Sequence, residues 1–414
     1  MSDEIFKIKH SLRDFFYICK KNIMIDISLY SYMDSMLKQT PLKFKRYMYD
    51  KIAWNNRLVG VVGPRGIGKS TMLLQYIKEH SNDKEYLYVS ADHTYFTNHS
   101  LIELVDDFVK YGGTRLFIDE VHKYKTWSRE LKQAYDVYPN LKIVFTGSSV
   151  LDIMEGEADL SRRALMYSMQ GLSFREYLGL FHDINVPSFT LPQILEHKIE
   201  LSDLEHPLLL FQEYLKTGYY PFSKEDGFEI RMENIIDQTV GMDIPQYADM
   251  KASTARKLKR MLVVISQLAP YKPNAESLAT EIGVSKNNIS DYLVYLEKAG
   301  MIGMLRDETG GLRGLGKVEK VYVDNPNLMN VLSGGSPDVG NIRETFFYNQ
   351  MRVMNDVISS KKSDFVIDEF TFEIGGKNKK QKQISDIPNS FVVKDDIEIG
   401  HANVIPLWYF GMNY

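Results

Sequence analysis

The sequence predicts an α/β fold built on a parallel β-sheet, followed by a helical region and two smaller domains. The first observation is that apolar, strand-like runs alternate with helical patterns from about residue 46 to about residue 175, as in a doubly wound sheet. The second is a glycine-rich loop at 63–70, between one such strand and one such helix. The third is a succession of helical patterns and strand-like segments at 256–330, in the order of a winged helix.

The glycine-rich loop is the strongest functional signal. Residues 63–70 read Gly-Pro-Arg-Gly-Ile-Gly-Lys-Ser and fit G-x-x-x-x-G-K-[ST], the pattern that wraps nucleotide phosphates. Glycine permits the tight turns that aim backbone N–H groups at phosphate oxygens. A strand at 57–62 precedes the loop and a helix at 71–77 follows it, so that the helix N-terminus favours an anion. We therefore expect the cofactor ATP to be bound by Gly63, Pro64, Arg65, Gly66, Ile67, Gly68, Lys69, Ser70 and Thr71.

Two carboxylates are expected to face these phosphates. Residues 116–120 predict an apolar strand that ends in Asp119 and Glu120, and acids at the carboxyl end of a parallel strand face the ligand crevice. The Lys69 ammonium would neutralise the β- and γ-phosphates, and Ser70 and Asp119 would hold Mg²⁺, the latter directly or through water. Glu120 would orient and deprotonate the attacking water.

Further polar residues could act during phosphoryl transfer. Residues 142–149 predict another buried strand, at whose end Thr146 or Ser148 could contact the γ-phosphate or the attacking water. A plain strand-to-loop transition explains the same residues. Arg162 and Arg163 could stabilise the charge that develops during transfer, or could be a solvated pair that neutralises nearby acids. The sequence does not choose between the two arginines, nor between the chain's own nucleotide and a neighbour's.

Several of these segments carry a family resemblance. From Gly60 to Leu180 the chain resembles the AAA-type P-loop ATPases of bacteria and archaea that carry a C-terminal restriction-endonuclease-like domain. The matching segments are 63–70 (GPRGIGKS), 118–123 (IDEVHK), 145–149 (FTGSS), 161–164 (SRRA), 171–177 (GLSFREY), 211–215 (FQEYL) and 218–221 (GYYP). The resemblance covers nearly the whole chain after about residue 45, and it implies an additional-strand sheet and hydrolysis of ATP to ADP and phosphate.

Pattern and resemblance together divide the chain into five parts. We expect a helical segment at 1–45, the ATPase domain at 46–175, a helical lid at 176–255, the winged helix at 256–330 and a degenerate nuclease-like α+β domain at 331–414.

The third helix of the winged helix, at 286–299, could read DNA. Amides and hydroxyls can contact base edges in the major groove, but Asp291 and Glu297 lie on the same helix, where phosphate contact requires positive charge. The exposed side chains expected on it are Lys286, Asn287, Asn288, Ser290 and Tyr292. Two functions stay open: an ATPase that acts on DNA or is regulated by it, and an ATP-dependent switch or scaffold for a protein partner with no role for DNA.

The nuclease-like region has candidate metal-binding acids at Glu344, Asp364 and Glu373. Such nucleases place a lysine two residues after the second strand acid, and that position is Gly375. We therefore expect a fold kept for binding or packing, without nuclease activity. Nearby lysines could contact a nucleic-acid backbone, or could be the solvated tip of a hairpin: Lys377, Lys379, Lys380 and Lys382.

Composition sets the remaining expectations. Apolar residues make up 44% and charged residues 25% of the 414, as in globular proteins with an ample core, and the net charge of −4 gives no global attraction to nucleic acid. The single Cys19 excludes an intrachain disulfide. No signal peptide and no apolar run approaching the roughly 20 residues of a membrane span is visible. We expect a cytoplasmic protein that does not bind membranes, and an oligomer is compatible with the sequence.

Overall fold

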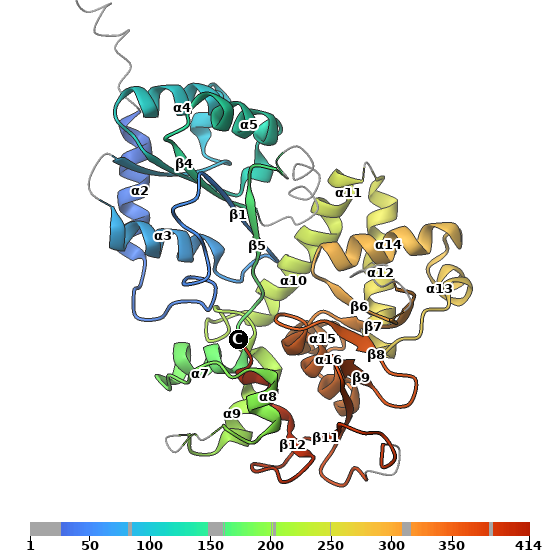
Figure 1. The fold of residues 1–414 in the computed structure, drawn as a ribbon. Helices are drawn as coiled ribbons and strands as arrows, with labels where there is room; N and C mark the ends of the chain where they lie inside the picture. The colour runs from blue at the N-terminus through green and yellow to red at the C-terminus, as the bar shows by residue number, and fades with distance from the viewer. Residues whose placement is uncertain are drawn as a thin grey trace, which may run out of the picture.

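The computed structural model describes residues 26–81, 85–147, 160, 162–199, 201, 204–248, 250–308, 316–380 and 384–414. Most of the predicted N-terminal segment, Ser148 and Lys382 lie outside these residues. In Figure 1 the first sheet and helices α2 to α5 form one lobe, drawn in blue and teal with strand β5 in green. Helices α10 to α14 lie beside this lobe, and the second sheet, in red, lies below them with α7 to α9 at its side.

The first sheet confirms the predicted parallel α/β architecture. Its strand order is β2-β3-β4-β1-β5, and every pairing is parallel. Strands β1 and β2 are buried along their whole length, as expected for a parallel sheet covered on both faces. The strands are β1 (Leu58–Val62), β2 (Tyr86–Ser90), β3 (Arg115–Asp119), β4 (Lys142–Gly147) and β5 (Leu165–Ser168).

Helices cover both faces of this sheet because successive strand residues point to opposite sides. Val59 and Val61 pack in the core that contains α3, whereas Leu58 packs in the core of α4 and α5. Helix α4 begins with a capping box between Ser100 and Glu103. The helical elements of this lobe are α2 (Ile27–Gln39), α3 (Lys69–His80), η2 (Thr94–Thr97), α4 (Leu101–Lys110), η3 (Val121–Lys123) and α5 (Trp127–Val137).

The stretch predicted as a helical lid is mostly helical, and its two halves pack in different cores. The first half shares a core with the C-terminal region, and the second half shares one with α3 and β1. The first half contains α7 (Phe174–His182), α8 (Leu191–Leu195), α9 (Pro207–Glu213) and the π-helix η4 (Tyr214–Gly218). The second contains α10 (Phe228–Gln238), the π-helix η5 (Thr239–Asp243), α11 (Ile244–Tyr247) and the start of α12 (Ala252–Leu268).

The helices and strands predicted at 256–330 are present, whereas their assignment as a winged helix stays a prediction. Helix α12 is followed by α13 (Ala275–Ile282) and α14 (Asn287–Lys298), then by the antiparallel strands β6 (Ile302–Arg306) and β7 (Val318–Val323). The expectation that Tyr292 is exposed is wrong. Its side chain is 8% exposed, because it lies on the same face of α14 as the apolar residues of the core.

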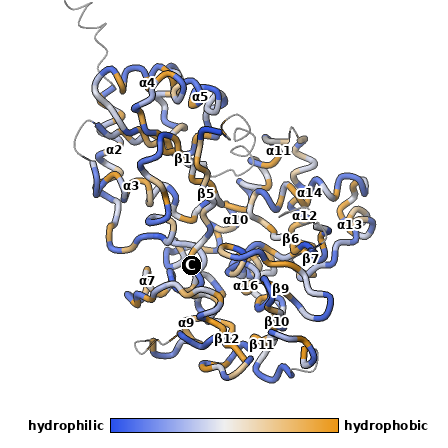
Figure 2. Tube along the Cα trace, in the orientation of Figure 1, coloured by the Kyte–Doolittle hydropathy of each residue, from blue (hydrophilic) through white to orange (hydrophobic). Residues whose placement is uncertain are grey.

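The C-terminal region is a mixed sheet packed on helices, with the order β12-β11-β10-β9-β8. The pairings from β8 to β10 are antiparallel, and those from β10 to β12 are parallel. Figure 2 shows hydrophilic residues mainly along outer loops and turns, such as those around α13. The elements are α15 (Pro326–Leu332), α16 (Val339–Met351), β8 (Val357–Ser359), β9 (Phe365–Ile367), β10 (Phe370–Gly375), β11 (Ser390–Lys394), β12 (Val404–Pro406) and η7 (Leu407–Met412).

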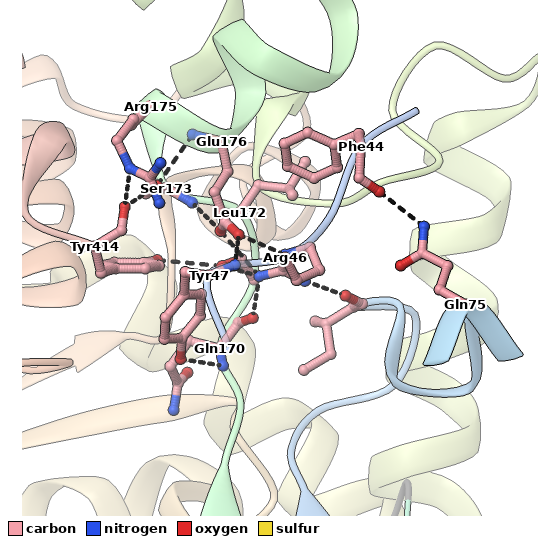
Figure 3. A network of polar contacts seen from close by, with 12 residues as sticks. Phe44, Arg46, Tyr47, Gln75, Gln170, Leu172, Ser173, Arg175, Glu176 and Tyr414 are labelled. Carbon is pink, nitrogen blue, oxygen red and sulfur yellow. Dashed lines mark hydrogen bonds and ion pairs between the residues drawn. The ribbon is translucent and has the colours of Figure 1, made fainter. Parts of the chain in front are cut away.

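A buried ion pair holds several of these segments together (Figure 3). The Arg46 side chain is 6% exposed and that of Glu176 is 1% exposed. Arg46 Nε donates to Glu176 Oε1 at 2.9 Å, and Arg46 Nη2 is 3.1 Å from Glu176 Oε2. The same guanidinium donates to the backbone oxygens of Ile67, Gln170 (2.7 Å) and Gly171 (2.8 Å). The pair therefore joins the loop at 63–70 to the segment that leads into α7.

The segment 171–177 extends this network, which gives it a structural role. Ser173 caps α7, since its Oγ accepts from the backbone N–H of Glu176 at 3.1 Å. The Ser173 hydroxyl and Arg175 Nε both donate to the backbone oxygen of Tyr414, at 2.8 and 2.7 Å. This segment thus connects the glycine-rich loop at 63–70 to the C-terminal region.

We expect Arg46→Met to lower the free energy of unfolding by about 3–5 kcal/mol, because it leaves the Glu176 carboxylate buried without its cation. Urea denaturation measures this loss. The control is Lys43→Met, which removes an exposed ion pair with Asp183 and should cost at most about 1 kcal/mol. Equal losses in the two variants would show that the buried pair has no special role.

Candidate nucleotide-binding site

The loop at 63–70 has the backbone conformation that its glycines predict. Gly63, Gly66 and Gly68 all have positive φ, at 153°, 77° and 94°. A Cβ on Gly63 would lie 2.2 Å from the backbone oxygen of Met169, so no side chain fits there. Gly68 offers no side-chain hydrogen bond to the start of α3, which leaves the first N–H groups of that helix available for an anion.

Lys69 lies over this loop. Its side chain is buried, and Nζ donates to the backbone oxygens of Gly63 and Pro64 at 2.8 and 2.7 Å. Burial lowers the pKa of Lys69 to about 8, although the nearby Glu120 and Asp119 carboxylates oppose this shift. Lys69 and Glu120 also line the same cleft, so the structure brings the predicted lysine to the end of β3, where the two predicted acids lie.

The two acids are held by Thr146. Asp119 is buried at the end of β3, where it accepts hydrogen bonds from the hydroxyls of Tyr88 (2.9 Å) and Thr146. Thr146 Oγ1 also accepts from the backbone N–H of Glu120 at 3.1 Å. Its hydroxyl therefore positions the acids, and any contact with a phosphate or water stays a prediction.

Glu120 has a left-handed backbone, with φ of 53°, which is unusual outside glycine and concentrates at functional sites. Its carboxylate lies 3.7 Å from Arg65 Nη1 and 4.0 Å from His122 Nε2. Burial raises the pKa of Glu120, and the Arg65 guanidinium opposes that rise. Burial also lowers the pKa of His122 to about 3, so its imidazole is uncharged at neutral pH.

The residues predicted to hold Mg²⁺ have suitable chemistry. Ser70 supplies a hydroxyl and Asp119 a carboxylate, and Mg²⁺ prefers such oxygen ligands together with substrate phosphates and water. In the described ranges, no group of three or more His, Cys, Asp or Glu side chains is placed to hold a metal without other ligands.

A cleft of about 320 Å³ lies over the loop, and its far wall is formed by Pro221, Phe222 and Glu225. Pro221 ends the segment 218–221 that carries part of the family resemblance, whereas the sequence patterns did not identify Phe222 and Glu225. The contact is close, since a Cβ on Gly66 would lie 2.7 Å from the Phe222 ring. The remaining lining residues are Gly66, Ile67, Gly68, Lys69, Ser70, Thr71 and Glu120.

Two further distant segments reach the loop. Arg65 forms a two-point ion pair with Asp243 of η5, from Nε to Oδ2 at 2.8 Å and from Nη2 to Oδ1 at 3.1 Å. At the end of α14, a Cβ on Gly300 would lie 2.7 Å from Cγ of Pro64. The phosphate loop is thus in contact with both the helical region and α14.

The structure does not bring the predicted arginines to this loop. Arg162 and Arg163 precede β5, whose Leu165 pairs with Val59 near the start of β1, whereas the loop follows the end of β1. Arg163 donates to Asp136 of α5 at 3.0 and 3.1 Å, and Arg162 is exposed. Both arginines therefore lie at the opposite edge of the sheet, and action on a neighbour's nucleotide stays a prediction.

The candidate acids of the C-terminal region already contact lysines. Lys320 Nζ lies 3.1 Å from Glu344 and 3.3 Å from Asp364, and Lys379 Nζ lies 2.5 Å from Glu373. Asp364, Glu373 and Lys320 line a cavity of about 950 Å³. The ion pair of Lys379 also reduces the charge of the predicted basic patch.

Comparison with known proteins agrees with the geometry of the first site. Residues 55–178 match the model of an AAA domain, and residues 208–338 match that of a domain of unknown function (DUF8612). The first match agrees with the predicted AAA-type P-loop domain and covers residues 55–178 of the chain. The predicted resemblance to restriction endonucleases finds no support in these matches.

Individual proteins show more distant similarity. An uncharacterized protein of Methanocaldococcus jannaschii is 26% identical over 315 residues, which are 67% of this chain and 66% of that protein, slightly less than two thirds of its length. A Walker-type ATPase of Pyrococcus abyssi is 13% identical over 72% of this chain and 99% of its own, with a TM-score of 0.43. AMPPCP-bound DnaA of Aquifex aeolicus is 12% identical over 61% of this chain and 84% of its own, with a TM-score of 0.25.

Among the helices of the described ranges, none combines the length and apolar character that a bilayer crossing requires.

We expect Thr146→Val to slow ATP hydrolysis about tenfold or more, because Asp119 loses a hydrogen-bond donor and the Glu120 N–H loses its acceptor. Steady-state kcat measures this, and a melting curve confirms that the variant is folded. Thr280→Val, on the exposed face of α13, is the control. Unchanged turnover in folded Thr146→Val protein would show that the acids need no such support.

Proposed function

We propose that this protein binds ATP with Mg²⁺ and hydrolyses it to ADP and phosphate. The observation that carries the proposal is that Lys69 and Glu120 line one cleft, with Asp119 joined to Glu120 through Thr146, over a loop whose backbone matches its phosphate-binding pattern. This combination supplies positive charge for phosphates and a carboxylate for water in one cleft.

Each residue has a distinct part in this proposal. Backbone N–H groups of the loop and of the first turn of α3 bind phosphate oxygens, and Lys69 neutralises their charge. Ser70 and Asp119 hold Mg²⁺, which adds positive charge at the phosphates when it is bound. Glu120, whose backbone is fixed by Thr146, orients the attacking water and takes its proton.

In an oligomer, one of the two predicted arginines could act on the nucleotide of a neighbouring subunit, in addition to Arg65 of the site itself. Arg162 is exposed at the far edge of the sheet and is the better placed of the two, since Arg163 is paired with Asp136. We propose this assembly as part of the same function.

The first test compares two variants of the site. We expect Lys69→Ala to lose measurable binding of a fluorescent ATP analogue, because no other charge of the loop reaches the same position. Glu120→Gln should bind the analogue but hydrolyse ATP at least about 100-fold more slowly, since an amide cannot accept the proton. Lys110→Ala and Glu229→Gln, both exposed, are the matched controls. Normal turnover by Glu120→Gln would remove Glu120 from the role of base.

We further propose that the protein uses ATP hydrolysis to act on DNA, or that DNA regulates the hydrolysis. Lys286, Asn287, Asn288 and Ser290 are exposed at the start of α14, where they could contact a groove. Glu297 of the same helix is paired with Arg306 at 2.7 Å, which reduces its repulsion of phosphates.

The alternative is an ATP-dependent switch for a protein partner. The contact between Gly300 and Pro64 favours it, because α14 then responds to the phosphate loop whether or not DNA is present.

Titration of the ATPase with duplex and single-stranded DNA separates these two functions. If DNA is involved, we expect faster hydrolysis at about 50 mM salt and a steep loss of the effect at about 200 mM. Absence of both binding and stimulation at the lower salt concentration would favour the switch. The same samples report nuclease activity: Mg²⁺-dependent cleavage that Glu373→Ala abolishes would contradict the expected degenerate domain.

A further inference from the structure

We propose that Arg65 is a positioning residue, whose guanidinium links Asp243 of η5 to Glu120 and thereby fixes the place of the Glu120 carboxylate for hydrolysis. This inference rests on the proposed ATPase function. If it is correct, the position of the helical region affects ATP hydrolysis through Arg65, a side chain of the phosphate loop.

The geometry of the Arg65 side chain carries the inference. The side chain is 16% exposed, and its partner Asp243 is 7% exposed. Two parallel hydrogen bonds to one carboxylate fix the plane of a guanidinium, which a single contact does not. The remaining nitrogen, Nη1, then lies 3.7 Å from Glu120 Oε2. Arg65 is therefore held from the η5 side and presents a fixed positive charge to Glu120.

The element that holds Arg65 is itself unusual. η5 is a π-helix between α10 and α11, and π-helical turns occur frequently at functional sites because they change the direction of side chains. Asp243 is its last residue. On either side in sequence, Val240 and Ile244 are completely buried in the core that includes α3. The backbone around Asp243 is therefore fixed by packing, and Asp243 moves only when the helical region moves.

The charges around Glu120 explain why this link matters. Arg65 and Lys69 approach it from the loop, Asp119 from β3 and Lys123 from η3, and the His122 imidazole beside it is uncharged at neutral pH. Because Asp243 takes two of the Arg65 nitrogens, the Arg65–Glu120 separation exceeds hydrogen-bond distance. Without Asp243, the Arg65 guanidinium would lose the two-point contact that fixes its plane relative to Glu120. Without Arg65, Glu120 would lose the charge that orients it.

The experiment measures ATP hydrolysis and binding of a fluorescent ATP analogue for Arg65→Ala, Arg65→Lys, Asp243→Asn and the double variant Arg65→Ala/Asp243→Asn. We expect each to lower kcat about tenfold or more, because small misplacement of a reacting group is costly, while the Kd of the analogue changes less than about threefold. Arg65→Lys should not restore kcat, since an ammonium cannot reproduce the two-point contact.

The double variant distinguishes positioning from general loss of structure. Since Asp243 acts through Arg65, its substitution should add nothing to Arg65→Ala, and the double variant should match that single variant within about twofold. The double variant also keeps the test valid if Arg65→Ala folds poorly. In Arg65→Ala the buried Asp243 carboxylate has lost its cation, and the Asp243→Asn substitution removes that charge. Asp237→Asn, at an exposed ion pair on the neighbouring α10, is the control and should retain full kcat.

The outcomes separate this inference from the proposed function. A wild-type protein that neither binds nor hydrolyses ATP overturns the proposed function. A wild-type protein that hydrolyses ATP, with single variants that keep kcat within about twofold, overturns the role of Arg65 alone. Weakened analogue binding with unchanged kcat, or additive losses in the double variant, also overturns it.

Discussion

The buried pair of Arg46 and Glu176 is the constraint on which the rest of this structure depends. A buried pair of charges is stable only when its remaining hydrogen bonds are also made. Here the Arg46 guanidinium donates to three backbone oxygens in addition to Glu176. One of these oxygens belongs to Ile67 in the phosphate loop, and the others precede α7. The shape of the loop is therefore maintained partly by residues far outside its own sequence pattern.

Three other contacts place the same loop at the centre of the molecule. Phe222 lies against Gly66, Asp243 binds Arg65, and Gly300 approaches Pro64. Each partner comes from a different segment beyond the AAA domain. The first lobe is consequently not an independent unit to which other segments are attached, because its glycine-rich loop is in contact with all three. The proposed nucleotide site would therefore change with the arrangement of these segments.

The sequence predicted those features that depend on residues close to one another in the chain. The parallel sheet, the phosphate loop and the acids at the end of β3 follow from local patterns of apolar residues and glycine. The link from Arg65 to Asp243 joins residues 178 positions apart and leaves no periodic signal. Arg162 and Arg163 appeared useful for phosphoryl transfer, but only the strand register shows at which edge of the sheet they lie. Tyr292 was misassigned because a tyrosine suits either face of an amphipathic helix.

The close approach of Gly300 to Pro64 has a mechanical consequence. Gly300 has a φ of 71° and no side chain, so a shift of Pro64 would press directly on its backbone. A push from Pro64 would therefore reach the backbone at the end of α14. The 12 residues of this helix form a stiff rod about 18 Å long. Its far end carries Asn287 and Asn288 in solvent, so a displacement at Gly300 would be transmitted along α14 to the outer surface.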